Sequence, residues 1–295
     1  MLNKPIRPVT IASISGPRER PEEFLRQAGQ AAERHPDLIV LPETWQPVME
    51  ETIDSEVIDR LCALARANRC YILHPTMLLD ENRRFNSALL IGRDGGIAGR
   101  YDKLYPYWSE FEANSEGRSC TPGCGNGVME CDFGRIAVRI CFDANFPEIW
   151  AYVAEQGAEL IVWSSAYGAG AQLAAHALNH HYPIVTSTLS GHCMVFDING
   201  ERVLNVQGRV HYTQWIALDL DRCIFHENFN EEKLDSLLRE EPGLVEVERH
   251  MRDEQWIIVR SAQEGVSARE VCAKAGMEEL RAYKQRSRRA IDDMR

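Results

Sequence analysis

The chain has 295 residues, of which 44% are hydrophobic and 26% are charged, and these proportions are typical of a globular protein. Its formal net charge of -11 argues against a general nucleic-acid-binding protein, which would be expected to carry a basic surface. No apolar run approaches the length of a membrane span, and the N-terminal stretch lacks the unbroken apolar core of a signal peptide. We therefore expect a cytoplasmic protein.

The first third of the chain alternates strand and helix patterns, which is typical of a layered α/β fold. Residues 21–35 have the apolar spacing of an amphipathic helix that starts at a proline. Residues 37–43 (DLIVLPE) form a short apolar run of the kind found in strands that are covered on both faces. In chain order, the expected elements are a strand at 9–15, a helix at 21–35, a strand at 37–43, a helix at 55–69 and a strand at 70–78.

The middle of the chain is richer in strand patterns, with hairpin turns expected at residues 94–96, at residues 132–134 and at Asn199-Gly200. The expected elements are paired strands within 86–105 and within 127–141, a helix at 147–156, a strand at 159–164, a helix at 171–180, a strand at 184–189, a hairpin at 192–206 and a strand at 214–221. We expect one domain over residues 1–225. A helical C-terminal extension is expected over residues 226–295.

The nine cysteines are scattered singly, and an odd number cannot form a complete disulfide framework within one chain. Most are expected to be small buried hydrophobes in a reducing compartment. Cys120, Cys124 and Cys131 are close enough in sequence to suggest zinc, but they lack a CxxC pair and a nearby histidine. We therefore expect no zinc site there.

Three histidines lie close together in the chain, namely His176, His180 and His181. The first two are one helical turn apart, a spacing that suits two metal ligands, but no carboxylate motif accompanies them. A position on a helix at a subunit surface is the expected alternative to a metal site.

Cys141 lies where the alternating strand pattern of residues 135–140 ends. Asp143 and Asn145 are helix-initiating types, and Pro147 suits a first helical turn. The carboxyl end of a strand in an α/β sheet is the usual place for a ligand crevice. Helix-end amides and a nearby cation would lower the pKa of the thiol and favour the nucleophilic thiolate. The alternative is that Cys141 is one more packed cysteine.

Two further residues also follow predicted strands. Glu43 comes directly after LIVLP, where it would either cap a turn or act as a general base with a raised pKa. Lys103, in GRYDKLYPYW, would either extend its ammonium to the surface or serve as a fixed cation that stabilises an oxyanion. A thiol, a carboxylate and an ammonium at strand ends form a coherent set for acyl transfer.

The motifs LPE, YDK and CFDANFPE occur in the order and at roughly the intervals of the nitrilase, or carbon–nitrogen hydrolase, superfamily, which the chain resembles over about residues 5–220. The resemblance implies a four-layer α-β-β-α sandwich with a Glu-Lys-Cys triad. It makes Glu43 the base, Lys103 the stabiliser of the tetrahedral intermediate, and Cys141 the nucleophile that forms a thioester. It implies no metal and no organic cofactor, because the thioester carries the chemistry.

The resemblance also implies an oxyanion hole completed by the backbone N–H of Phe142, and a second glutamate that holds the substrate and the lysine. Glu110, Glu112 and Glu116 all lie between Lys103 and the Pro122-Gly123 pair. Glu110 is favoured because it continues the YPYW segment attached to the lysine, whereas Glu116 keeps the spacing to the Pro-Gly pair.

Residues expected to face the substrate follow the strand ELIVWSS, where the family often contacts substrate, or lie in the YPYW segment. They are Ser165, Ala166, Tyr167, Tyr107 and Trp108, together with Phe142. Core packing is the alternative for the aromatic members, because aromatic side chains often fill interiors.

The residues after the nucleophile bear on the substrate. Cys141-Phe142-Asp143 is similar to the amidase-like and carbamoylase-like branches, whereas true nitrilases tend to have Trp-Glu after the cysteine. A carboxamide substrate is therefore expected first, an N-carbamoyl compound second and a nitrile third. The resemblance also implies at least a homodimer.

The C-terminal extension is charged and helical in pattern. Residues 266–283 faintly resemble a helix-turn-helix with Gly276 at the turn, so DNA binding is one alternative function. An arm that packs on a neighbouring subunit is the expected one. A binding protein that has lost catalysis is a further alternative, against which the presence of all three triad residues argues.

Overall fold

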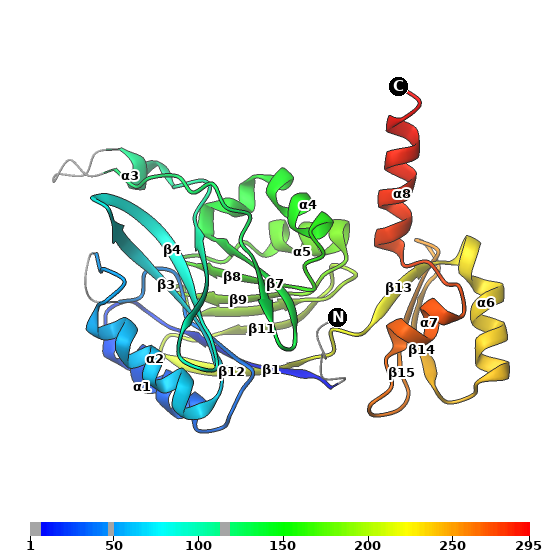
Figure 1. The fold of residues 1–295 in the computed structure, drawn as a ribbon, viewed down its shortest axis with the longest axis horizontal. Helices are drawn as coiled ribbons and strands as arrows, with labels where there is room; N and C mark the ends of the chain where they lie inside the picture. Colours follow the sequence, from blue (N-terminus) through cyan, green and yellow to red (C-terminus); the bar gives the residue numbers. More distant parts are fainter. Residues whose placement is uncertain (1–6, 47–49, 113–118) are drawn as a thin grey trace. The chain divides into compact units, whose positions relative to one another are not determined.

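The computed structural model describes residues 7–46, 50–112 and 119–295, which fall into two compact units (Figure 1). The larger unit is Val9–Leu218, and the smaller one comprises Asp219–Arg295 with Arg7 and Pro8. Within the described ranges, no helix combines the length and the apolar character needed to cross a membrane.

The larger unit is built on two mixed six-stranded sheets, as the resemblance implies. The first has the order β12 (Tyr212–Leu218), β1 (Val9–Ser15), β2 (Leu38–Val40), β3 (Tyr71–Asp80), β4 (Arg83–Ile91) and β5 (Ile97–Asp102). The second has the order β11 (Arg202–Gln207), β10 (His192–Phe196), β9 (Ile184–Thr188), β8 (Leu160–Ser165), β7 (Gly134–Ile140) and β6 (Val128–Cys131). The central strands of each sheet are parallel, and the outer pairs are antiparallel.

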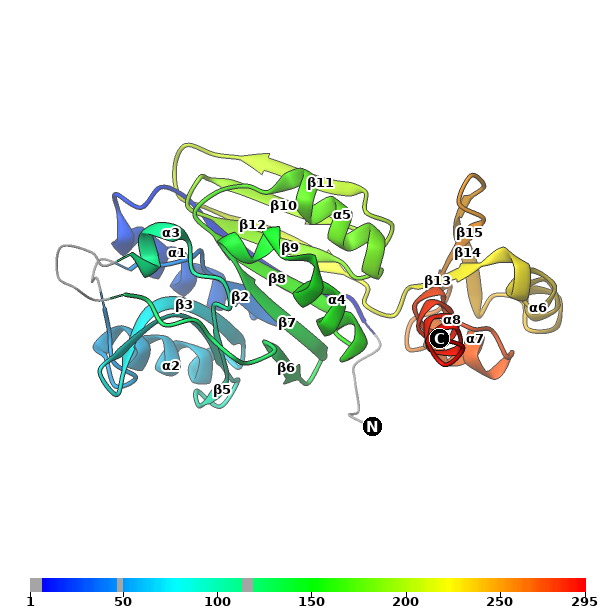
Figure 2. The ribbon, with the colours of Figure 1, turned by 90° about the horizontal axis from the view of Figure 1, so that it is seen from above.

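Helices cover the outer face of each sheet (Figure 2). The first sheet packs against α1 (Pro21–Ala32) and α2 (Glu56–Asn68) around a shared apolar cluster. The second packs against α4 (Pro147–Glu155) and α5 (Gly170–His180). The expected four-layer α-β-β-α sandwich is therefore confirmed.

Local sequence explains where these helices start and which face they bury. Pro21 opens α1, whose buried Phe24 and Ala28 are one turn apart. Ser55 caps α2 by accepting a hydrogen bond from the backbone N–H of Ile58 at 3.3 Å. The chain leaves α2 through Arg69 in the left-handed conformation, with φ of 52°. Each helix thus joins the sandwich through a single apolar face.

The two sheets are held face to face partly by hydroxyl groups. Ser13 on β1 donates to the carbonyl of Thr186 on β9 at 2.7 Å, and Ser164 on β8 donates to the carbonyl of Leu41 at 2.9 Å. All of these side chains are fully buried. Because buried hydroxyls are costly without partners, these bonds fix how the strand ends of one sheet meet those of the other.

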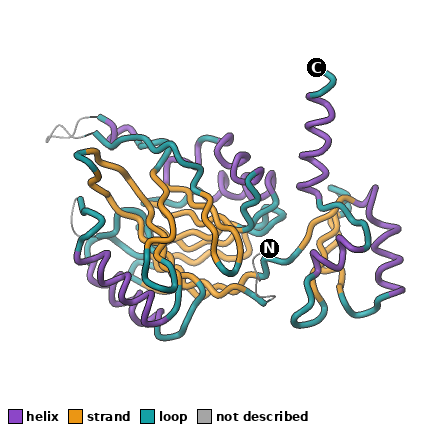
Figure 3. The backbone as a smooth tube through the Cα atoms, in the orientation of Figure 1, coloured by secondary structure: helices purple, strands orange, loops and turns teal. Residues whose placement is uncertain are grey.

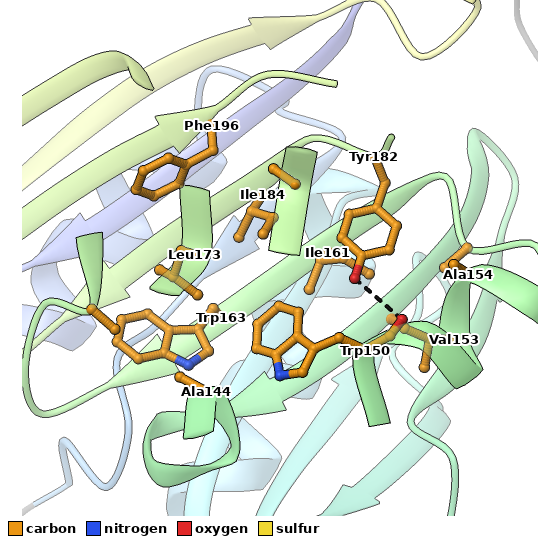
Figure 4. Close-up of a cluster of buried hydrophobic side chains, with 14 of the residues drawn as sticks. Ala144, Trp150, Val153, Ala154, Ile161, Trp163, Leu173, Tyr182, Ile184 and Phe196 are labelled. Atoms are coloured by element: carbon orange, nitrogen blue, oxygen red, sulfur yellow. Dashed lines mark hydrogen bonds between the residues drawn. The ribbon is translucent and has the colours of Figure 1, made fainter. Parts of the chain in front are cut away.

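The core under α4 and α5 is aromatic (Figure 4). Trp150 lies at its centre, and its backbone carbonyl accepts from the Tyr182 hydroxyl at 3.2 Å. The His176 ring stacks on Trp150 with centroids 4.2 Å apart and bonds the carbonyl of Ala144 at 2.9 Å. The expectation that His176 lies at a surface is therefore wrong, because its ring serves as part of this core.

The smaller unit contains strands as well as helices (Figure 3). Its elements are β13 (Cys223–His226), α6 (Glu227–Glu240), β14 (Val245–Met251), β15 (Trp256–Ser261), α7 (Ala268–Lys274) and α8 (Leu280–Asp292). The expectation of a purely helical extension is wrong, because the apolar runs CIFH and WIIVRS form the mostly buried strands β13 and β15, and the mostly exposed β14 pairs with β15. The turn between α7 and α8 contains Gly276 at φ of 75°.

We expect Trp150→Ala to lower the free energy of unfolding by about 3–5 kcal/mol, because it leaves a large cavity under α4. Urea denaturation followed by circular dichroism measures this loss. Ile53→Ala, at a side chain that is 52% exposed, is the matched control and should change the same quantity by about 0.5 kcal/mol or less. Equal losses for the two variants would contradict this account of the core.

Candidate active site

The three residues of the expected triad each lie just beyond the carboxyl end of a strand. Glu43 follows β2 and Lys103 follows β5 in the first sheet, while Cys141 follows β7 in the second. The structure brings the three together where these two sheet edges meet. The three side chains that the sequence pattern places at strand ends therefore lie close together in the structure.

Lys103 is held between two carboxylates. Its Nζ donates to Glu43 Oε1 at 2.9 Å and to Glu110 Oε2 at 2.7 Å. The Lys103 side chain is 1% exposed, so it does not reach solvent as the surface alternative requires. Burial disfavours the ammonium, but the charges of Glu43 and Glu110 outweigh it and raise the pKa of Lys103 above its ordinary value. The lysine is a fixed cation.

The Glu43 carboxylate is ionised at neutral pH, contrary to the raised pKa that the sequence suggests for it. Burial alone would raise the pKa of Glu43, but the charge of Lys103 and hydrogen bonds from Lys103, Asn86 and Cys141 together lower it. Its second oxygen, Oε2, accepts the backbone N–H of Ala166 at 3.0 Å. Burial alone predicts the wrong direction of the shift, because the fold supplies these partners from distant parts of the chain.

Cys141 begins a short 3-10 helix, Cys141–Asn145, and its backbone has φ of 46°. This conformation is uncommon for a residue with a side chain and is often found at functional turns. The buried Asp143 carboxylate closes the turn, because its Oδ2 accepts the backbone N–H of Ile140 at 2.9 Å and the Tyr101 hydroxyl at 2.7 Å. The thiol is thereby presented at the strand end.

The thiol of Cys141 is protonated in the resting site. Burial, followed by the negative charge of Glu43, raises the pKa of Cys141 to about 12, and the opposing effect of Lys103 is smaller. The expectation that helix amides and a cation would yield a resting thiolate is therefore wrong. The helical turn at Cys141 is short, and the neighbouring cation is already neutralised by two carboxylates.

The segment after β8 forms the second side of the site. The Ser165 hydroxyl accepts the backbone N–H of Tyr167 at 3.0 Å, and Ser165 lies near enough to Cys141 to offset part of the rise in the pKa of that thiol. Burial, followed by the proximity of Cys141 and Glu43, raises the pKa of Tyr167. Ser165, Ala166 and Tyr167 are thus all at the site, as expected from the sequence.

Aromatic rings lie beside the nucleophile. Phe142 contacts Tyr107 edge to face, with centroids 5.3 Å apart, and Tyr107 in turn contacts Trp108 at 5.7 Å. Tyr107 and Trp108 are 40% and 53% exposed, so neither is a core residue. The packing alternative for these two rings is therefore wrong, and they are available to contact a ligand.

The structure distinguishes between two of the three candidates for the second glutamate. Glu110, in the short helix α3 (Trp108–Phe111), bonds Lys103 and accepts the backbone N–H of Tyr107 at 2.6 Å. Glu112 follows that helix and is exposed. Glu116 lies outside the described residues. Glu110 is the described candidate that touches the lysine.

Two residues at the site were missed by the sequence analysis. Asn86 on β4 donates to both Glu43 and Glu110, and Tyr101 on β5 donates to Asp143. Both lie inside strand patterns, where a polar side chain gives no signal of its own. The distance along the chain between Asn86 and either glutamate also hides their contact.

Cys120 and Cys131 are buried while Cys124 is exposed, and the Cys120 sulfur accepts the backbone N–H of Asn86 at 3.2 Å. Over residues 7–46, 50–112 and 119–295, no group of three or more His, Cys, Asp or Glu side chains has the arrangement of a metal site.

Residues 11–224 match the family model described as carbon-nitrogen hydrolase. Curated relatives include omega-amidase NIT2 of Xenopus tropicalis, which is 23% identical over 150 residues, with 47% of this chain and 54% of that protein covered. The chloroplastic omega-amidase of Arabidopsis thaliana is 26% identical over 157 residues, with 47% of this chain and 42% of that protein covered. The chain spans about half the length of the curated relatives it matches.

Solved structures share the fold. Nit3 of Saccharomyces cerevisiae, a member of branch 10 of the nitrilase superfamily, has a TM-score of 0.61 at 19% identity, with 80% of this chain and 95% of Nit3 covered. An amidase from Nesterenkonia sp. has a TM-score of 0.60 at 19% identity, with coverages of 72% and 91%. Both cover most of the sandwich at low identity, so they support the architecture.

We expect the thiolate of Cys141 to be absent at neutral pH, because burial and the Glu43 charge raise its pKa to about 12. The difference in ultraviolet thiolate absorbance between the wild type and Cys141→Ala, measured against pH, isolates this one thiol. It should stay flat through about pH 8.5, the usual pKa of cysteine. A thiolate step near neutrality would contradict the protonated resting state.

Proposed function

The chain belongs to the carbon–nitrogen hydrolase family, and we propose that it is a cysteine-dependent amidase that hydrolyses a small carboxamide through a thioester. The family establishes a hydrolase of carbon–nitrogen bonds. The observation that carries the finer proposal is the position of Glu43, whose Oε1 pairs with the Lys103 ammonium at 2.9 Å and whose charge is near enough to the Cys141 thiol to raise its pKa. This position gives the thiol a base and places a cation beside that base.

In the acylation half, the Cys141 sulfur attacks the carbonyl carbon of the amide while its proton passes to Glu43. The carbonyl oxygen becomes an oxyanion, which Lys103 and the backbone N–H of Phe142 stabilise. Glu43 then returns the proton to the amide nitrogen, so that the carbon–nitrogen bond breaks and ammonia leaves. The product is a thioester on Cys141 and an ionised Glu43.

In the deacylation half, water takes the place of the departed amine. Glu43 accepts a proton from that water as its oxygen attacks the thioester carbon. The second tetrahedral intermediate collapses with cleavage of the carbon–sulfur bond, and Glu43 returns the proton to the sulfur. The carboxylic acid leaves, and the resting pair of a protonated Cys141 and an ionised Glu43 is restored. Glu110 holds Lys103 in place throughout.

Relatives support an amide over other substrates. Several are named omega-amidases, and variants of the amidase from Nesterenkonia sp. are described in complex with acrylamide and with butyramide. Another variant of that amidase is described with the acetamide moiety of fluoroacetamide added covalently at its active-site cysteine. The Phe142-Asp143 pair after our nucleophile, which is similar to the amidase-like branch, supports the same choice.

We also propose a cytoplasmic homodimer or larger homo-oligomer in which the C-terminal unit packs on a neighbouring subunit. All nine cysteines are free thiols, which supports a reducing compartment. Tyr152 on α4 is 47% exposed and Leu178 on α5 is 39% exposed, which supports an apolar contact on that helical layer. The C-terminal unit carries more Asp and Glu than Lys and Arg, which favours a protein partner over DNA.

Purified protein should release ammonia from small carboxamides such as butyramide, more slowly from N-carbamoyl compounds and very little from nitriles. A coupled ammonia assay on matched amide, carbamoyl and nitrile substrates measures this ranking. A nitrile must lose its nitrogen through a thioimidate, so the two routes differ after the first attack. Faster hydrolysis of nitriles than of the matching amides would overturn the ranking.

Cys141→Ala is the decisive control for that assay, because it removes the nucleophile and should abolish turnover. Cys62→Ala is matched to it, since both thiols are partly buried, and it should retain most of the activity. Full activity in Cys141→Ala would contradict the cysteine mechanism.

The proposed assembly predicts that light scattering at low protein concentration gives a mass at least twice the 33.5 kDa of one chain. Tyr152→Arg should weaken the association, because it places a charge on the exposed apolar part of α4. A stable, active monomer in the wild type would show that the assembly proposal is wrong.

A further inference from the structure

Asn86 occupies an unusual position between the two glutamates of the site. It lies within β4, and its side-chain Nδ2 donates to Glu43 Oε1 at 2.8 Å and to Glu110 Oε1 at 2.6 Å. The same two carboxylates accept the Nζ of Lys103 at 2.9 Å and 2.7 Å. Two donors and two carboxylates therefore close a ring, in which Asn86 is the member that carries no charge.

The backbone of Asn86 fixes the position of this amide. Its N–H donates to the Cys120 sulfur at 3.2 Å, and its carbonyl accepts the N–H of Lys103 at 2.8 Å. The pairing of β4 with β5, which ends just before Lys103, thus sets the positions of both donors of the ring at once. A shift of either strand would move Asn86 and Lys103 together.

The orientation of the amide group is also determined. If the group were turned over, its Oδ1 would face two carboxylates, which accept hydrogen bonds and cannot donate them. In the orientation present, Oδ1 is buried, and no hydrogen-bond partner for it lies among the described residues. A buried amide that serves only to stabilise the fold is normally satisfied at both of its atoms. Asn86 instead directs its donors to the site and leaves its own carbonyl unpaired.

We infer that Asn86 is a positioning residue for the reaction. It holds Glu43 and Glu110 around Lys103, and it leaves one oxygen of Glu43 able to accept the proton of the Cys141 thiol. This inference rests on the proposed function. Glu43 Oε1 already accepts two donors, whereas Oε2 accepts the backbone N–H of Ala166. Oε2 therefore has the capacity to receive the proton of Cys141.

A neutral donor suits this place better than a second cation would. Two neighbouring carboxylates repel each other, and donors placed between them offset that repulsion. A second cation would neutralise the site further and compete with Lys103 for both carboxylates. Asn86 stabilises them without adding charge, and its bond is one of the contacts that lower the pKa of Glu43. The base stays ionised, and Lys103 keeps its charge available for the oxyanion.

The test compares Asn86→Leu and Asn86→Asp through the pH dependence of kcat/KM on butyramide. Asn86→Leu removes the donor, so kcat/KM should fall by about 10- to 100-fold and its acidic limb should move to higher pH. Asn86→Asp keeps the shape, and a protonated aspartic acid can still donate one hydrogen bond. Its kcat/KM should fall as pH rises and a third carboxylate ionises, over a range in which the wild type is flat.

Asn230→Leu is the matched control, because Asn230 is an equally buried asparagine whose amide bonds the carbonyls of His226 and Glu278 in the C-terminal unit. It should leave the pH profile unchanged. Thermal unfolding of all three variants identifies any that has lost its fold. If Asn86→Asp keeps the wild-type pH profile, or Asn86→Leu loses activity without a shift of the acidic limb, the positioning role is overturned.

A second readout separates this inference from the proposed function. The rate at which iodoacetamide alkylates Cys141, measured by mass spectrometry against pH, depends on Glu43 as the proton acceptor and needs no amide turnover. The two Asn86 variants should change this pH dependence in the same directions as above. If the wild type hydrolyses no amide but the alkylation profiles still shift, the proposed function fails and the role of Asn86 stands. Unshifted alkylation profiles in folded variants overturn that role.

Discussion

Lys103 is almost completely buried, and a buried ammonium is stable only where carboxylates and hydrogen bonds replace its water. Glu43 supplies one carboxylate from the loop after β2, and Glu110 supplies the other from the short helix α3. The need to pair this ammonium also constrains the course of the backbone. Because each glutamate must reach the same Nζ, the loop after β2 and the segment after β5 have to converge on one edge of the sandwich.

This cluster determines the state of the nucleophile. A site that holds two carboxylates and one ammonium is negative before the thiol ionises, so a resting thiolate would add charge where charge is already unfavourable. The pKa of Cys141 is accordingly raised and that of Glu43 is lowered. The proton stays on sulfur until a carbonyl is present to accept the electron pair. Such a site protects the thiol from adventitious oxidation, because the thiolate is the reactive form.

The sequence predicts the sandwich because its central strands are short apolar runs and its helices carry single apolar faces at clear caps. It also indicates that Glu43, Lys103 and Cys141 lie at strand ends, and in the structure Lys103 and Cys141 directly follow β5 and β7 while Glu43 lies three residues beyond β2. It predicts the wrong direction for the pKa shifts of Glu43 and Cys141, because a pKa depends on partners that the fold supplies. Asn86 was missed for the same reason, and His176 was misplaced because nothing in the chain marks its stacking on Trp150. In the C-terminal unit, β14 gives little strand signal because it is mostly charged and exposed, whereas the apolar runs of β13 and β15 do indicate strands.

The central claim is that Cys141 is acylated during turnover, and peptide-resolved mass spectrometry after acid quenching tests it most directly. Wild-type protein mixed with a small carboxamide should carry the acyl group on the peptide that contains Cys141, with a mass gain equal to the amide minus ammonia. Cys141→Ala should carry no such group. Glu43→Gln should acylate slowly and, once acylated, retain the adduct, because water lacks its base. Amide hydrolysis by the wild type with an adduct on another residue, or with the Cys141 peptide unmodified at every quench time, would contradict the account.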